Sequence, residues 1–431
     1  MIASPGSTLQ EAYMKLRAPR TIDPTVFAPP APRPPADVVR PAHRLEAVDL
    51  LRGLVIALMV LDHVRDYLSN VALVFVPTDL TRTTPALFAT RWVTHLCAPT
   101  FALLAGAGAY LQRARARERG EPLGGVARFL LTRGLWLVAL EVTVVSFALD
   151  FTWPFAFLQI IWAIGAGFVT LAALLWLPPA LVLALGAAVV AGHGTLASVV
   201  APASAWRFWL LPGPLPGPLA GAPGFVAYPA LPWVGILWLG YGLGPVFTRP
   251  DARRRGAVLR LAGGLLAAFV VLRLPNLDGE PASWSPQPRG AVYTALSLIN
   301  VSKYPPSLQF VLLTLGVSLP LGVLLEGLRG GLGGLVRRVL LAYGRTPMFT
   351  YLVHLFLVHG SAMLIGVALG FRASDFVGFI SDPRRLQRAG WGIELSAVYL
   401  VWLLVLAALY PLSRWYAAYR ARSGRWWVRY L

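Results

Sequence analysis

Ten long stretches of mainly apolar residues restrict the fold of this chain more than any other feature of its sequence. A helix needs roughly 20 apolar residues to cross about 30 Å of hydrocarbon, and these stretches are close to that length. Only 13% of the residues are charged, against about 25% in soluble domains. The apolar runs are continuous and lack the alternation of a membrane β-barrel. The sequence therefore predicts an all-α, polytopic transmembrane helix bundle of about ten spans, at residues 48–68, 90–112, 129–150, 155–176, 178–199, 227–248, 257–274, 307–327, 346–370 and 393–413.

The distribution of basic residues predicts the orientation of these spans. Lys and Arg collect in cytoplasmic loops. If the N-terminus is cytoplasmic, the basic residues of the inside segments outnumber those of the outside segments three to one. We therefore predict a multi-pass protein of the cytoplasmic (inner) membrane with both termini in the cytoplasm. The net charge of +19 then belongs to short loops between spans, and no nucleic-acid partner is expected.

Three regions follow from this distribution. Residues 1–45 are rich in Pro and Arg and predict a flexible cytoplasmic tail, residues 46–413 form the transmembrane domain, and residues 414–431 alternate Arg with Trp and Tyr. The last segment is typical of a cytoplasmic helix at the anionic membrane interface. The lone Cys97 excludes an internal disulfide, and the chain shows no metal-ligand spacing, no phosphate-binding loop and no nucleophile elbow. No metal is expected.

Ionisable residues within spans are candidate functional sites, because burying charge in hydrocarbon costs several kcal/mol. Asp49 and Arg52 are spaced i, i+3 near the inner end of the first span and can pair. This pair is equally consistent with a simple interfacial ion pair and with phosphate binding.

A second group lies further out. Asp62 and His63 are about 15 Å beyond Arg52 along the helix, and the second span can bring His95 to a similar depth. With Asp79, they can form a general base with an orienting carboxylate, since imidazole titrates near neutrality. The alternative is that each histidine is a helix-to-helix hydrogen-bond partner.

Two later spans carry further candidates. Arg133 lies near the inner end of the third span and Glu141 near its mid-depth. The ninth span carries Arg345 at its inner start and His354 near mid-bilayer. His359, further out, is expected to be interfacial or structural.

Several long motifs resemble one protein family. The chain contains RLEAVDLLRGLVIALMVLDHVRDYL, PTDLTRTTPALFATRWVTHLCAPTFALLAGAGAYL, LQIIWAIG, YPALPWVGILWLGYGLGPVF, INVSKYPPSLQF and GRTPMFTYLVHLFLVH. Together these motifs resemble the bacterial membrane proteins grouped with heparan-α-glucosaminide N-acetyltransferase, from residue 44 to about 410. The segment RGLVIALMVLDH also resembles the opening motif of the acyltransferase-3 family of envelope O-acetyltransferases.

The resemblance implies an acetyl-CoA-dependent transmembrane acyltransferase. Acetyl-CoA would enter from the cytoplasm, and a histidine in the membrane would pass its acetyl group to a sugar amine or hydroxyl on the far side. His63 matches the histidine of the acyltransferase-3 motif, and His354 falls on a family histidine, whereas His95 stands where the family motif is acidic. Between the first two spans, where the lysosomal enzyme has its catalytic histidine, this chain has Asp79 and no histidine.

These matches lead to a set of predicted roles. His63 would act as general base or transient acyl acceptor, with Asp62 or Asp79 orienting it and His95 and His354 positioning the thioester. The phosphates of CoA would bind the arginines predicted near inner helix ends, because guanidinium forks match phosphate geometry. These are Arg52, Arg133 and Arg345.

Two other functions remain open at this stage. In a proton-coupled transporter, His63, Glu141 and His354 would relay protons. In a non-catalytic scaffold, the ionisable residues would only pair with one another. Membrane lipid and a glycan or other hydroxyl or amine acceptor are the expected partners, and a homodimer is left open.

Overall fold

The structure is a computed structural model, and it describes residues 46–72, 74–199, 206–219, 221, 223–277, 280–425 and 428. The predicted N-terminal tail, 1–45, lies outside the described residues. Of the predicted C-terminal segment, residues 414–425 and 428 are described.

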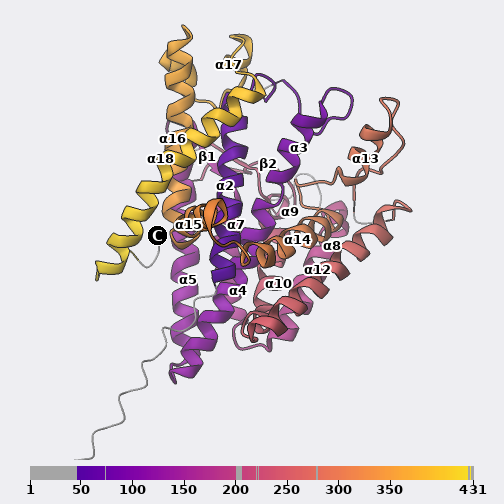
Figure 1. The fold of residues 1–431 in the computed structure, drawn as a ribbon, viewed down its shortest axis with the longest axis vertical. Helices are drawn as coiled ribbons and strands as arrows, with labels where there is room; N and C mark the ends of the chain where they lie inside the picture. The colour runs from indigo at the N-terminus through magenta and orange to yellow at the C-terminus, as the bar shows by residue number, and fades with distance from the viewer. Residues whose placement is uncertain are drawn as a thin grey trace, which may run out of the picture. The chain divides into compact units, whose positions relative to one another are not determined.

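Helix α2 (Glu46–Leu68) runs through the middle of the bundle (Figure 1). Its sequence is almost entirely apolar between Leu50 and Leu61, apart from Arg52. The surrounding helices bury most of it on every side. Six helices pack against it: α3 (Pro85–Thr94), α4 (Cys97–Glu118), α14 (Leu308–Leu325), α15 (Gly331–Arg345), α16 (Pro347–Ala368) and α18 (Leu395–Arg422).

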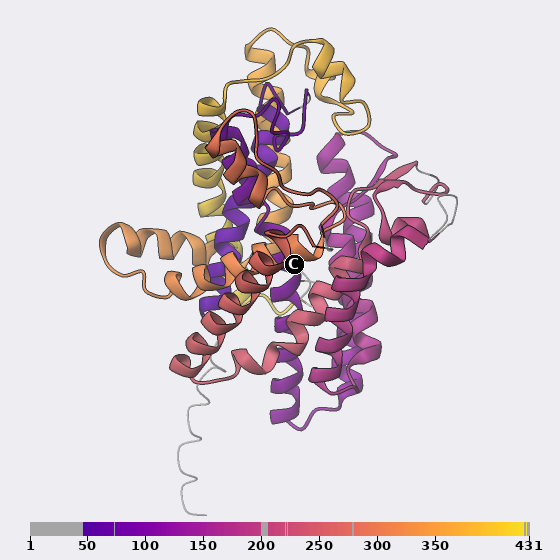
Figure 2. The ribbon, with the colours of Figure 1, turned by 90° about the vertical axis from the view of Figure 1, so that its right-hand side faces the viewer.

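A second set of helices extends from α4 (Figure 2). The third predicted span is an α-helix interrupted by a π-turn, and α10 packs against α4, α7 and α8. The elements of this set are α5 (Leu123–Leu140), η2 (Glu141–Val145), α6 (Ser146–Asp150), α7 (Ile160–Leu174), α8 (Pro179–Val199) and α10 (Ala230–Gly242). The remaining long helix, α12 (Asp251–Arg273), packs on α14. Short elements complete the chain: α9 (Arg207–Leu210), α11 (Gly244–Phe247), α13 (Ala291–Ile299), η3 (Ala373–Phe376) and α17 (Arg384–Arg388).

The predicted fold class, an all-α polytopic bundle, is confirmed, and each of the ten predicted spans falls on a helix. Within the described residues, seven helical segments are long and apolar enough to cross a membrane, and α7 and α10 are shorter apolar helices. The one remaining predicted span, the first, falls on α2, which carries six charged residues: Glu46, Asp49, Arg52, Asp62, Arg65 and Asp66. The last helix continues through the predicted boundary at 413 to Arg422.

Two features differ from the sequence prediction. The predicted span 155–176 begins as a strand, because β1 (Ala156–Leu158) pairs in parallel with β3 (Gly224–Val226), which also pairs with β2 (Gly213–Pro214). The predicted inside loop after residue 329 contains the helix α15, which has a strongly one-sided apolar pattern rather than a continuous apolar run. The strands are short and α15 is amphipathic, so neither feature gives the long apolar run that identifies a span.

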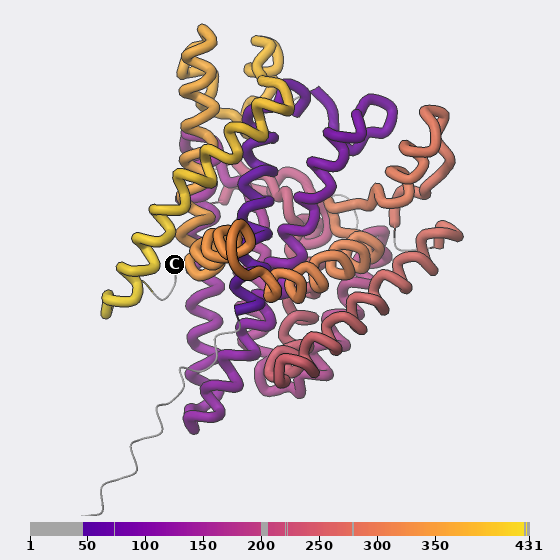
Figure 3. The backbone as a smooth tube through the Cα atoms, in the orientation of Figure 1, coloured from indigo at the N-terminus to yellow at the C-terminus, as the bar shows by residue number. Residues whose placement is uncertain are grey.

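Helix α15 crosses α2 steeply: in Figure 3 α15 is seen nearly end-on, whereas α2 runs vertically in the plane of the picture. Glycines allow the two backbones to touch. A Cβ at Gly53 of α2 would overlap the carbonyl oxygen of Leu340, and one at Gly344 of α15 would overlap the carbonyl oxygen of Asp49. Small residues of this kind let membrane helices approach closely.

This contact predicts the effect of one methyl group. Gly53→Ala should lower the free energy of unfolding by about 1–3 kcal/mol, because the backbone of α15 must move away. Gly263→Ala, in α12, is the matched control, since a Cβ there meets nothing within 4 Å. Thermal unfolding in detergent measures both, and equal stability of the two variants would contradict the close contact.

Candidate functional site

Two histidines from distant parts of the chain form a direct pair. His63 Nδ1 of α2 lies 2.6 Å from His354 Nε2 of α16, with the two rings nearly parallel at 9°. His354 is fully buried, whereas His63 is partly exposed. The pair joins two of the predicted site residues, although the sequence indicated His95 rather than His354 as the neighbour of His63.

His63 lies in the wall of a cavity of about 680 Å³. Acidic side chains of α2 and a ring of aromatic side chains line it. The strand residues Phe157 and Phe225 pair in the small sheet and face it, and Tyr228 and Tyr304 lie with their hydroxyl oxygens 3.2 Å apart. The lining includes Asp62, His63, Asp66, Tyr67, Phe155, Phe157, Gln159, Phe225, Tyr228, Tyr304 and Phe379. A cavity with many aromatic walls and few polar groups suits an organic ligand.

Next to His63, Asp62 is the centre of a buried ion cluster. Arg91 Nη1 and the Thr94 hydroxyl each donate to Asp62 Oδ1 at 2.7 Å. Arg65 Nη2 lies 2.8 Å from the same oxygen, and Lys303 Nζ lies 3.7 Å from Oδ2. Arg65 also pairs with Asp66. The cluster therefore holds the carboxylate of Asp62 with basic groups from three segments.

The carboxylates expected to orient His63 lie elsewhere. Asp62 directs its oxygens to the basic cluster, and Asp79 accepts hydrogen bonds from the backbone N–H and hydroxyl of Thr81 in its own loop. Within the described residues, neither carboxylate is hydrogen-bonded to His63, and His354 takes that place. These carboxylates instead find partners nearer to them, one in the ion cluster and one in a local turn.

His95 is buried beside the ion cluster rather than on the cavity wall. Its ring meets Phe310 edge-on at 5.6 Å, and Arg91 and Lys303 lie close enough for their charges to act on it. Among the described residues, His95 Nδ1 has no hydrogen-bond partner. His95 therefore belongs to the surroundings of Asp62 and not to the cavity wall.

Two other ionisable residues of the spans have local structural roles. Glu141 accepts hydrogen bonds from the backbone N–H groups of Gln159 and Trp162, so it caps the start of α7. His359 lies between the carbonyl oxygens of Ala148 and Phe376, at 3.0 and 2.8 Å. The structural role predicted for His359 agrees with this position.

The three arginines predicted to bind phosphate do not form one site. Arg52 pairs with Asp49 at 3.2 Å, as its spacing predicted, and also donates to the carbonyl of Gly344. Arg345 is exposed and lies 4.0 Å from Glu46. Arg52 therefore contributes to the contact between α2 and α15.

Arg133 lines a separate basic pocket of about 430 Å³. Its guanidinium lies 5.7 Å from the ring of Phe168. Polar and basic residues of α4, α5 and the C-terminal part of the chain line the pocket: Gln112, Arg115, Arg133, Arg420 and Arg425. Arg420 also donates to the carbonyl of Arg345, which places that helix end beside the pocket. Four guanidinium groups in one depression match an anion such as a diphosphate.

Sequence reasoning missed several residues of these two sites. The sequence indicates Arg91 and Lys303 only as charges at a span end and in a loop, although Lys303 is one of two lysines in the chain. Arg420 and Arg425 were assigned to an interfacial tail. Each of these residues comes from a segment remote from its partners, so no local spacing could identify it.

The half-buried carboxylate of Glu280 fastens the loop that carries Lys303 and Tyr304. Glu280 accepts hydrogen bonds from the backbone N–H of Ser302 at 3.0 Å and from the hydroxyl of Ser307 at 2.5 Å. Burial raises the pKa of the Glu280 carboxyl above its ordinary value, and the Ser307 hydroxyl opposes this effect. Glu280 therefore fixes one wall of the cavity.

The fold is that of a multi-pass membrane protein with a histidine pair beside a cavity. The family model described as heparan-alpha-glucosaminide N-acetyltransferase, catalytic, matches residues 44–272. This is more than half of the sequence, so the chain belongs to that family and is, in general terms, a membrane acetyltransferase. The family uses acetyl-CoA as donor. The match includes His63, while His354 lies beyond it. No curated protein matches the chain.

The raised pKa of Glu280 predicts a pH dependence. A carboxyl that binds its proton more tightly in the folded state loses stability as pH rises from the ordinary glutamate range through the folded pKa. Glu280→Gln should therefore flatten the fall in stability over this window, as measured by thermal unfolding at a series of pH values. An unchanged pH profile would contradict the burial of a titrating carboxyl at this position.

Proposed function

We propose that this protein of the cytoplasmic membrane transfers an acetyl group from acetyl-CoA, bound on the cytoplasmic side, to an amine or hydroxyl of an acceptor in the 680 Å³ cavity. The contact between His63 and His354 at the cavity wall is the observation that carries the proposal. A sugar is the acceptor class that the family description suggests. The aromatic lining supports this, because the apolar faces of a sugar ring pack on aromatic rings.

The histidine pair leaves one nitrogen available to the cavity. In the tautomer that we assign, the proton of His354 is on Nδ1, which has no hydrogen-bond partner among the described residues. His354 Nε2 then accepts a hydrogen bond from His63 Nδ1, and the lone pair of His63 lies on Nε2. This tautomer is part of the proposal, because the 2.6 Å contact admits the proton on either ring. It makes His63 the base and His354 the residue that orients it.

The transfer balances with His63 as proton carrier. His63 Nε2 takes the proton of the acceptor amine or hydroxyl as that atom forms a bond to the thioester carbonyl carbon. When the carbon–sulfur bond breaks, the imidazolium returns the proton to the departing thiolate. His354 Nε2 holds the Nδ1 proton of His63 throughout, so the ring keeps one orientation.

The ion cluster supports this step electrostatically. Arg65, Arg91 and Lys303 surround Asp62 and Asp66, so the cluster has an excess of positive charge beside His63. Fixed positive charge in a site of low dielectric constant stabilises the oxyanion that develops on the carbonyl oxygen. His95 packs behind the cluster, and Asp79 orders the adjacent loop. We assign positioning roles to both.

The Arg133 pocket fits the donor. Its four guanidinium groups and Gln112 supply planar, charged donors, and within the described residues no carboxylate lines the pocket. This donor set matches the diphosphate of CoA, for which arginine forks form paired hydrogen bonds. We place the CoA phosphates there, with Arg345 beside the site rather than in it.

Replacing the base should abolish the reaction. His63→Ala should lower acetyl transfer by about 10²–10⁴-fold, the typical contribution of a general base, and His354→Ala should lower it less, because His63 loses only its orientation. The assay follows thiol release from acetyl-CoA with a panel of amino and hydroxyl sugars. His193→Ala is the matched control, since His193 is hydrogen-bonded to the carbonyl of Val190 in its own helix and does not line the cavity.

The same assay separates the competing function. Full activity in His63→Ala would overturn the catalytic assignment. Proton-coupled uptake by vesicles with no thiol release would favour the transporter, in which Glu141 relays protons, although Glu141 here caps α7.

Ligand-dependent stability tests the donor site. Acetyl-CoA at about 100 times its dissociation constant should stabilise the detergent-purified protein by about 2.7 kcal/mol. Arg133→Ala and Arg420→Ala should weaken this stabilisation, whereas Arg338→Ala, an exposed arginine of α15, should leave it unchanged. A full stabilisation in both pocket variants would place the donor elsewhere.

A further inference from the structure

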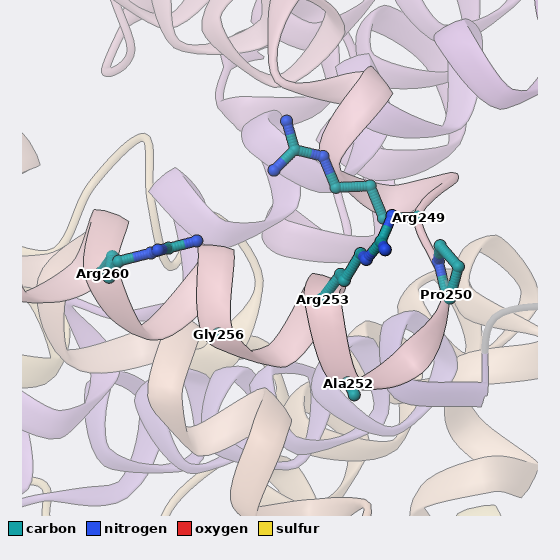
Figure 4. A pocket seen from close by; sticks show the side chains of 6 residues that line it. All are labelled: Arg249, Pro250, Ala252, Arg253, Gly256 and Arg260. Atoms are coloured by element: carbon teal, nitrogen blue, oxygen red, sulfur yellow. The ribbon is translucent and has the colours of Figure 1, made fainter.

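A second arginine-lined depression lies on α12, and none of its lining residues is among the catalytic residues proposed above. It has a volume of about 540 Å³ and is lined by Arg249, Pro250, Ala252, Arg253, Gly256 and Arg260. None of these residues lines the Arg133 pocket. Figure 4 shows Arg249 and Arg260 extending toward each other over the stretch of helix that contains Gly256. A Cβ at Gly256 would meet nothing within 4 Å, so the backbone is accessible there.

The three arginines carry charge that no acidic residue in the described part of the chain neutralises. The acidic residues nearby are already paired: Asp251 lies 2.8 Å from Arg254, and Glu326 binds both Arg254 and Arg255. Among the described residues, Arg249, Arg253 and Arg260 form no ion pair. Three unpaired guanidinium groups around one depression create a strong preference for an anion.

The position of the depression indicates the kind of anion. Helix α12 has the length and composition of a membrane span, yet only 17% of its apolar window is buried, so most of its surface faces lipid. Leu259, next to Arg260, is one of its exposed apolar residues. The depression occupies the first turns of this helix, where a span enters the headgroup layer. Its N-terminal N–H groups add a favourable field for an anion.

We infer that this depression binds the phosphate headgroup of an anionic phospholipid. Basic clusters at the cytoplasmic end of a span bind such headgroups, and the acyl chains would lie along the exposed apolar face of α12. The inference is independent of the proposed acyl transfer, because it uses none of the residues of the histidine pair or the Arg133 pocket.

Lipid binding to the purified full chain tests this inference. Native mass spectrometry would compare phosphatidylglycerol with phosphatidylcholine on the wild type and on a triple variant, Arg249→Ala, Arg253→Ala and Arg260→Ala. We expect phosphatidylglycerol to bind at least tenfold more weakly to the triple variant, with no change for phosphatidylcholine. The control variant removes the same charge from exposed arginines elsewhere: Arg338→Ala, Arg384→Ala and Arg388→Ala.

The outcomes are distinct. Equal weakening in both triple variants would overturn the site, since it would reflect net charge alone. The wild type could instead bind adenosine 3′,5′-bisphosphate and not phosphatidylglycerol, and lose this binding in the triple variant of the depression. That result would show a nucleotide site and would also overturn the assignment of a lipid. If the triple variant fails to fold, the single variant Arg260→Ala replaces it, with Arg338→Ala as its control. Full phosphatidylglycerol binding by Arg260→Ala would contradict the inference.

Discussion

A carboxylate buried in a membrane helix must be paired with positive charge at its own position, and the surroundings of Asp62 follow from this requirement. The cost of an unpaired charge in hydrocarbon is several kcal/mol. Arg65 of the same helix, Arg91 at the end of α3 and Lys303 in a distant loop meet this carboxylate. The cluster therefore fastens α3 and the loop to α2. Because Tyr304 follows Lys303, the same contact builds a wall of the cavity beside His63.

The histidine pair depends on a second constraint, the contact between α2 and α15. The two backbones touch at Gly53 and Gly344, and α16 begins at Pro347, immediately after α15 ends. From this common contact, His63 lies about 15 Å along α2 and His354 about 10 Å along α16, at 1.5 Å per residue. Positioning α15 therefore sets the start of the helix that carries His354, and the two rings can meet at one depth.

Local patterns in the sequence predicted the parts of this protein that depend on local interactions. Hydropathy located all ten helices of the spans, and the i, i+3 spacing predicted the pair of Asp49 and Arg52. The rarity of histidine in spans identified both His63 and His354 as candidates. Their direct contact, 291 positions apart in the chain, leaves no trace in hydropathy. The strands of the small sheet are only two or three residues long, and α15 is too amphipathic to resemble a span.

The proposed chemistry also suits the low dielectric constant in which it takes place. A relay that carries protons across the membrane must leave charge in the interior during each passage, which hydrocarbon opposes. In acyl transfer, by contrast, the proton that His63 takes from the acceptor goes back to the departing thiolate, so the histidine pair begins and ends neutral. The charge that appears in between lies beside the ion cluster of Asp62, where Arg65 and Lys303 are already held. A neutral histidine pair next to a fixed cationic cluster is therefore better matched to group transfer than to net proton movement.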